Sequence, residues 1–157
     1  MVMGWLLAVV LFFSAPQSAA TFTIGGSAIA KPMTLSSADL AAMPRESITL
    51  KEDDVDVRYD GVLLTTLLTK AGAPIGALRG KALTTTVLAE AKDGYRVVFS
   101  LGELDPDFGG AKVIVADQRN GKALFDYQGP FRLIVAGDKR GARGVRMLTA
   151  LTIAQVQ

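Results

Sequence analysis

Two residue types are missing from this 157-residue sequence, which contains no histidine and no cysteine. Without histidine there is no imidazole base, no histidine-activated nucleophile and no histidine metal ligand. Without cysteine there is no disulfide, no thiolate nucleophile and no cysteine ligand for zinc, haem or an iron–sulfur cluster. Any chemistry must therefore use carboxylates, lysine, arginine, tyrosine, serine or threonine, or a bound cofactor.

A strong excess of one charge is also missing, because 17 Lys and Arg stand against 15 Asp and Glu, for a net charge of +2. A nucleic-acid-binding domain normally carries a denser basic face, so we expect no nucleic-acid partner. The glycine motifs of nucleotide-binding loops are absent as well. The densest basic run comprises Lys139, Arg140, Arg143 and Arg146.

The first twenty residues contain no charged side chain. Residues 5–13 form an unbroken apolar run, and Pro16 and the small residues Ser18, Ala19 and Ala20 follow it. This order predicts a signal peptide at 1–20, cleaved after Ala20. The run is shorter than the roughly 20 apolar residues that cross a bilayer. We expect a periplasmic or secreted domain, 21–157, with no membrane span in its mature form. An uncleaved anchor or a buried first helix is the alternative.

The remaining sequence predicts one α+β domain, with a strand-rich mixed sheet, one good helix and one or two short ones. Apolar residues at helical spacing over 63–71, followed by Gly72, predict the good helix. Capping boxes at 36–39 and 100–103 predict the short ones. Asp60-Gly61 predicts a turn between a strand and the good helix, and Asp93-Gly94 and Asn120-Gly121 predict turns between strands. We expect strands at 22–24, 48–50, 55–59, 82–91, 95–99, 112–116, 123–125, 131–136 and 145–153.

The segment 129–146 is the strongest candidate for a binding site. Arg132 lies among apolar strand residues, so its charge must sit at an edge or find a partner. The loop that follows places Gly137, Gly141 and Gly144 among the four basic residues of the dense run. Glycine lets backbone N–H groups approach a ligand, and arginine binds phosphate through two parallel hydrogen bonds. These residues predict a cradle for a small anion, with a flexible basic surface hairpin as the alternative.

Two acidic features are less specific. Asp93-Gly94 is first of all a turn, and a ligand contact would be a second use of Asp93. The acidic stretch 52–56 is followed by Arg58 where a calcium loop would need an oxygen ligand, so we expect a solvated strand edge there and no metal site.

Five segments in order, 59–73, 93–106, 113–125, 129–148 and the closing strand, resemble the molybdopterin-binding domain of the sulfite oxidase family in its short, exported form. The resemblance implies a strand-rich α+β fold and a pterin cofactor, molybdopterin. By position, Asp93, Arg132, Arg143 and Arg146 match family residues that contact the pterin and its phosphate or shape an anionic substrate pocket.

The sequence departs from the family where the metal is held. The resemblance implies a cysteine thiolate on molybdenum from the segment ahead of Tyr59, and here residues 48–53 contain no sulfur. Tyr127 stands where the family has a histidine. Glu52 or Asp53 is the carboxylate that could take the place of the thiolate. We therefore assign no catalytic residue and no metal ligand.

Two functions stay open. The first is an exported oxidoreductase-like protein that holds a pterin phosphate or another small anion, with redox activity in doubt. The second is a cofactor-free binding or scaffold protein that has an exported partner and keeps only the fold.

Overall fold

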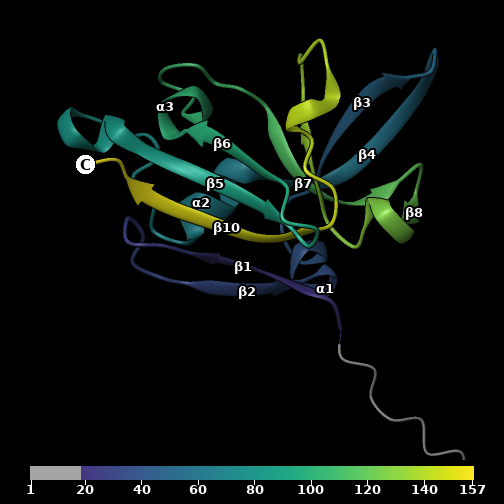
Figure 1. The fold of residues 1–157 in the computed structure, drawn as a ribbon, viewed down its shortest axis with the longest axis horizontal. Coiled ribbons are helices and arrows are strands. Elements are labelled where there is room, and N and C mark those ends of the chain that lie inside the picture. The colour runs from purple at the N-terminus through teal and green to yellow at the C-terminus, as the bar shows by residue number, and fades with distance from the viewer. Residues whose placement is uncertain (1–18) are drawn as a thin grey trace, which may run out of the picture.

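The computed structural model describes residues 19–157, and the 1–18 part of the predicted signal peptide lies outside them. The chain alternates strands with short helices (Figure 1). The strands are β1 Thr21–Gly25, β2 Met33–Ser36, β3 Glu46–Glu52, β4 Val55–Leu63, β5 Thr85–Ala91, β6 Arg96–Ser100, β7 Val113–Arg119, β8 Lys122–Ala123, β9 Arg132–Val135 and β10 Leu148–Gln155. The helices are α1 Ser37–Ala41, α2 Leu64–Lys70 and α3 Leu101–Leu104, and the 3₁₀ turns are η1 Gly80–Thr84, η2 Asp126–Gln128 and η3 Gly141–Arg143.

The strands form two five-stranded sheets. The first sheet has the order β2-β1-β10-β5-β6, with β1 parallel to β10 and the other pairs antiparallel. The second sheet has the order β3-β4-β7-β8, and β9 pairs with β7 as well. The described chain is therefore a strand-rich α+β domain with a mixed sheet, as its sequence predicts.

The main core unites apolar side chains of both sheets and the helices. Leu64, Leu67 and Leu68 of α2 are fully buried in it, which explains the helical spacing of apolar residues in that segment. Phe22 of β1 and Phe131 beside β9 meet there with their ring centroids 4.8 Å apart.

A second, smaller core covers the other face of the second sheet, and it includes Tyr59, Ile114 and Ile134. Strand β9 is buried on both faces and alternates between the two cores: Leu133 belongs to the main core and Ile134 to the second. Arg132 lies two residues before Ile134, so this alternation places its charged side chain on the same face of the sheet, the face of the second core.

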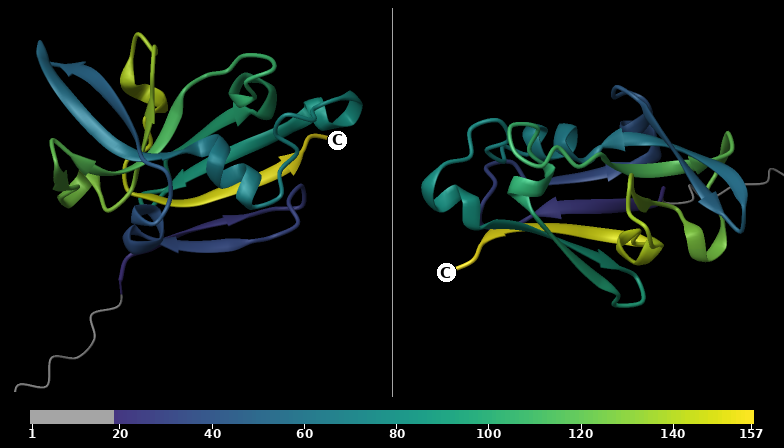
Figure 2. Two further views of the ribbon diagram at one scale, coloured as in Figure 1. Left: turned by 180° about the vertical axis from the view of Figure 1, so that it is seen from behind. Right: turned by 90° about the horizontal axis from the view of Figure 1, so that it is seen from above.

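Two arms extend from the body on the side of that face: the β3–β4 hairpin, and the loop 136–147 between β9 and β10, which contains η3 (Figures 1 and 2). The candidate site lies where these arms leave the second sheet.

Most local predictions are confirmed. The helix predicted over 63–71 is α2, and both capping boxes form, on Ser36 and on Ser100. The turns at Asp93-Gly94 and Asn120-Gly121 connect paired strands, and both glycines have positive φ. No helix within residues 19–157 is long and apolar enough to cross a membrane.

The turn predicted at Asp60-Gly61 is wrong, because both residues lie inside β4, where the register to β7 shifts. A Cβ on Gly61 would collide with the carbonyl oxygen of Val115 in β7. The glycine therefore serves close approach of two strands at a bulge. Residues 82–84, predicted as strand, form part of η1, and β8 ends at Ala123 so that 124–125 are not strand.

Candidate functional site

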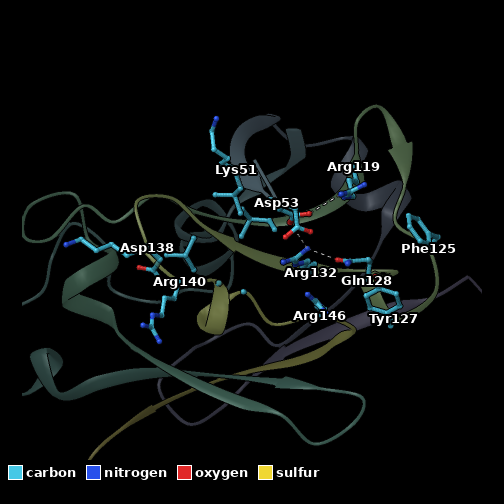
Figure 3. A pocket seen from close by; sticks show the side chains of 17 residues that line it. Lys51, Asp53, Arg119, Phe125, Tyr127, Gln128, Arg132, Asp138, Arg140 and Arg146 are labelled. Carbon is cyan, nitrogen blue, oxygen red and sulfur yellow. Dashed lines mark hydrogen bonds and ion pairs between the residues drawn. The ribbon is translucent and has the colours of Figure 1, made fainter. Parts of the chain in front are cut away.

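A pocket of about 730 Å³ opens between the two arms on the face of the second core (Figure 3). Its lining contains six basic and three acidic side chains, and the exposed rings of Phe125 and Tyr127 stand at one side of it. The basic residues are Lys51, Arg119, Arg132, Lys139, Arg140 and Arg146, and the acidic ones are Glu52, Asp53 and Asp138. The pocket is therefore electropositive.

Arg132 lies at the inner wall of this pocket, with only 4% of the residue exposed. Its Nη1 donates to the Tyr59 hydroxyl and to Oε1 of Gln128, both at 2.6 Å. Its Nε, also buried, has no hydrogen-bond partner among residues 19–157. Burial lowers the pKa of Arg132, and the nearby Tyr59 and Glu52 oppose that shift. The expectation that this charge would need a partner is confirmed.

Glu52, the last residue of β3, completes the inner wall. Its Oε1 accepts from the Tyr59 hydroxyl at 2.7 Å and lies 3.5 Å from Nη1 of Arg132, and its Oε2 accepts from Nη2 of Arg119 at 3.0 Å. Burial favours the neutral acid, but the hydrogen bonds from Tyr59 and Arg119 outweigh it and hold the pKa of Glu52 below its ordinary value. Glu52, Tyr59, Arg119 and Arg132, which we call the inner cluster, thus combine one carboxylate with two guanidinium groups.

Arg146 brings a third guanidinium to the same side. Figure 3 shows Arg146 beside Arg132 and near Tyr127, and its guanidinium carbon lies 5.3 Å from the centroid of the Tyr127 ring. Lys139 and Arg140 are exposed on the loop 136–147, and Figure 3 shows Arg140 on the far side of the pocket. The structure therefore brings Arg132 and Arg146 together and places other cations along the rim.

Arg143 does not line this pocket. Its guanidinium forms two hydrogen bonds to Asp138, at 2.8 and 2.9 Å, and one to Glu103 of α3 at 3.1 Å, and it lies over the Phe99 ring. The hydrogen bonds from Arg143 lower the pKa of Asp138, so this pair stays ionised. Arg143 thereby fastens the loop 136–147 to α3.

Asp93 lies outside the main pocket as well. Its Oδ1 accepts from the backbone N–H of Tyr95 at 3.0 Å, which is its turn role. It also lines a hollow of about 240 Å³ on the other side of the loop 136–147, shared with Arg146. Of the four residues that match the family by position, Arg146 alone borders both openings.

Sequence reasoning missed Arg119, Tyr59 and Gln128 as members of the site. Arg119 ends β7 just before the Asn120-Gly121 turn, where a charged residue is ordinarily exposed to solvent, so its position in the sequence does not indicate the site. Tyr59 shows only the alternation of a buried strand residue, and nothing in the sequence indicates that its hydroxyl meets three charged groups.

The chain offers no thiolate to a metal, and within residues 19–157 no group of three or more acidic side chains is arranged to hold one. The pocket does fit the other parts of a molybdopterin. Its volume admits a small ring system, its cations suit a phosphate, and Phe125 and Tyr127 offer aromatic faces to a planar ring.

Comparisons with known proteins identify the family of this chain. The family model for the oxidoreductase molybdopterin binding domain matches residues 13–157. No curated protein sequence matches the chain significantly. Twenty-nine chains of solved structures do, among them one from the crystal structure of the sulfane dehydrogenase SoxCD from Paracoccus pantotrophus.

That SoxCD chain is 24% identical, with a TM-score of 0.65 over 85% of this chain. At this identity the likeness shows the fold alone, and the match spans 37% of the SoxCD chain. The family model covers nearly the whole chain, in agreement with the order of segments in the sequence. The chain belongs to the family of sulfite oxidase-type oxidoreductase molybdopterin-binding domains.

Proposed function

We propose that this chain is an exported member of the family that holds the phosphate of a pterin cofactor, or another small oxyanion, in the pocket between its two arms. One observation carries the proposal: six basic side chains line a pocket of about 730 Å³ with only three acidic ones, and one of the cations, Arg132, is buried at its inner wall.

The physical argument starts from the cost of burying a guanidinium. An arginine with 4% exposure has lost most of its hydration, and this loss is tolerated only where hydrogen bonds and opposite charge replace it. Tyr59 and Gln128 satisfy Nη1, and Glu52 supplies part of the charge. With Arg119 and Arg146 beside it, the wall keeps a net positive charge, and an oxyanion that accepts charge-assisted hydrogen bonds would balance it.

The proposal concerns binding and assigns no redox step. Molybdopterin loaded with molybdenum would supply a redox-active metal, and Arg132 and Arg146 are the residues we expect at its phosphate. This chain cannot add a thiolate to that metal.

The second candidate is a binding or scaffold protein that takes no cofactor. The observation that favours it is that Glu52 already pairs with Arg119 and lies near Arg132, so part of the cationic wall is neutralised from within the chain.

The test begins with protein purified from the exported fraction of its native host. Molybdenum is measured by elemental analysis and pterin by fluorescence after release. Inorganic phosphate is then titrated calorimetrically into protein from which any bound cofactor has been removed. Bound pterin or saturable phosphate binding supports the proposal. Phosphate binding without bound pterin would support the anion site and overturn the assignment of pterin as its ligand. A protein that shows neither would overturn the proposal and favour the scaffold function.

Arg146→Ala tests the place of the site. We expect a roughly tenfold to hundredfold loss of phosphate affinity, the range for a hydrogen bond between charged groups. Arg79→Ala removes an arginine that is likewise exposed but lies outside the pocket, and it serves as the matched control, expected to bind as the parent does. Equal affinities of the two variants would place the anion elsewhere.

Export remains part of the proposal, supported by the apolar run at 5–13 and the small residues before Thr21. Intact mass measurement of the exported protein should give a chain that begins at Thr21. A chain in that fraction that retains Met1 would contradict cleavage.

A further inference from the structure

Glu52 is an unexpected occupant of an anion pocket. Its carboxylate accepts hydrogen bonds from Arg119 and Tyr59 and lies 3.5 Å from Arg132, all at the inner wall. Two of the guanidinium groups that an oxyanion would use are thus engaged by an anion of the protein itself.

The position of Glu52 in the chain allows this contact to break without unfolding the domain. Glu52 is the last residue of β3, at the edge of the second sheet, and its side chain is 29% exposed. The two residues after it, Asp53 and Asp54, form the tip of the β3–β4 hairpin and have positive φ. The hairpin extends away from the body (Figures 1 and 2). A rotamer change at Glu52 would therefore release the carboxylate into solvent at the pocket opening.

The partners that Glu52 would leave behind stay in place. Arg132 remains bonded to Gln128 and Tyr59. Arg119 keeps a hydrogen bond from its Nε to the Tyr59 hydroxyl at 3.3 Å. The wall of donors is therefore built independently of the carboxylate that it binds.

We propose that Glu52 is an intramolecular competitor for the anion site: its carboxylate occupies Arg119 and Arg132 when the pocket is empty, and an oxyanion binds there only by displacing it. This inference rests on the proposed function of the pocket. It assigns Glu52 the role of setting the affinity threshold, because a tethered carboxylate is always present at high effective concentration.

The test compares the calorimetric affinity of the parent and of Glu52→Gln for inorganic phosphate. The variant removes the charge, while its amide oxygen still accepts from Tyr59 or Arg119. Two unit charges about 4 Å apart interact by an energy that corresponds to about fivefold in affinity in bulk water, and to more near a protein surface, so we expect phosphate to bind at least about five times more tightly to the variant.

Asp53→Asn is the matched control, since Asp53 lines the same pocket but is exposed at the hairpin tip, and asparagine tolerates its positive φ. Screening by solvent and salt should keep its effect below about threefold. Circular dichroism checks folding, and Glu52→Met, uncharged and of similar length, repeats the comparison if the glutamine variant misfolds.

Three outcomes overturn the inference. Equal phosphate affinity of the parent and Glu52→Gln would leave the proposed function intact and remove the competitor. An equal gain in Asp53→Asn would show a general charge effect without displacement. Absence of phosphate binding in the parent and in every variant would overturn the competitor, and if the exported protein also carries no pterin it would end the proposed function as well.

Discussion

Replacement of Tyr59 by phenylalanine removes one oxygen atom from the centre of the inner cluster. Tyr59 is fully buried, so its ring packing in the second core persists in the variant. Its hydroxyl donates to Glu52 at 2.7 Å and accepts from Arg132 at 2.6 Å and from Arg119 at 3.3 Å. Tyr59→Phe therefore tests the polar contacts of the cluster apart from its apolar packing.

The expected loss follows from the charges involved. A hydrogen bond to a charged group contributes about 1.5–3 kcal/mol, and the buried Nη1 of Arg132 would keep Gln128 as its hydrogen-bond partner. The longer contact to Arg119 adds little. We expect the free energy of unfolding to fall by about 2–3 kcal/mol. At roughly 3 °C per kcal/mol for a domain of this size, the Tm falls by about 6–9 °C.

The measurement is urea unfolding followed by circular dichroism, with Tyr95→Phe as the matched control. The Tyr95 hydroxyl donates to the carbonyl oxygen of Ala142 at 2.6 Å, but the residue is 47% exposed and its partner is neutral, so we expect a loss of about 0–1 kcal/mol. A loss below about 0.5 kcal/mol in Tyr59→Phe, or equal losses in the two variants, would refute the view that this hydroxyl satisfies buried charge.

Three further predictions concern stability. Leu67→Ala truncates a fully buried side chain of α2 and should lower the free energy of unfolding, measured by urea unfolding, by about 2–5 kcal/mol. A loss under about 1 kcal/mol would mean that the surrounding side chains close over the site and leave no cavity. Gly61→Ala forces a Cβ against Val115 and should lower the free energy of unfolding. Gly102→Ala, which has open space around it in α3, should raise the free energy of unfolding by up to about 1 kcal/mol. A higher Tm for Gly61→Ala than for Gly102→Ala in thermal melts would contradict the close strand approach. The pKa of Glu52 is lowered in the folded chain, so its stabilising contribution is complete above the ordinary glutamate pKa of about 4.3 and is lost as the pH falls through the folded value. Urea titrations from about pH 6 to 3 should therefore show that the free energy of unfolding falls less steeply with pH in Glu52→Gln than in the parent. Parallel curves for the two proteins would exclude this linkage.

The fold could be predicted from local chemistry wherever one residue type determines a conformation. The capping serines, the Asn120-Gly121 turn and the leucine spacing of α2 each act within a few residues, and each is found where the sequence indicates. The turn predicted at Asp60-Gly61 was wrong because the glycine is required by close approach to β7, a strand distant in the sequence. A turn and a close strand approach both favour glycine, so the sequence alone does not distinguish them. The pairing of β1 with β10 had no local signal at all.

The site was predictable only in part for the same reason. Arg132 could be singled out because a charge among apolar strand residues needs an explanation within its own segment. Its partners Tyr59 and Glu52 come from β4 and β3, and their convergence depends on sheet order. Arg143 resembles a ligand residue by its position in a glycine-rich basic loop, yet Asp138 and Glu103 engage it.

The order of strands in the first sheet has a consequence for biosynthesis. Strand β10 lies at the centre of that sheet, between β1 and β5, although the ribosome makes it after all the others. The β1–β2 pair and the β5–β6 pair can each form early, but they cannot join until Leu148–Gln155 has been made and has left the exit tunnel. Non-local pairing of this kind slows folding. A chain in which β10 has not yet paired thus exposes two unfinished sheet edges, and we expect it to depend on chaperones that shield these edges until β10 inserts between them.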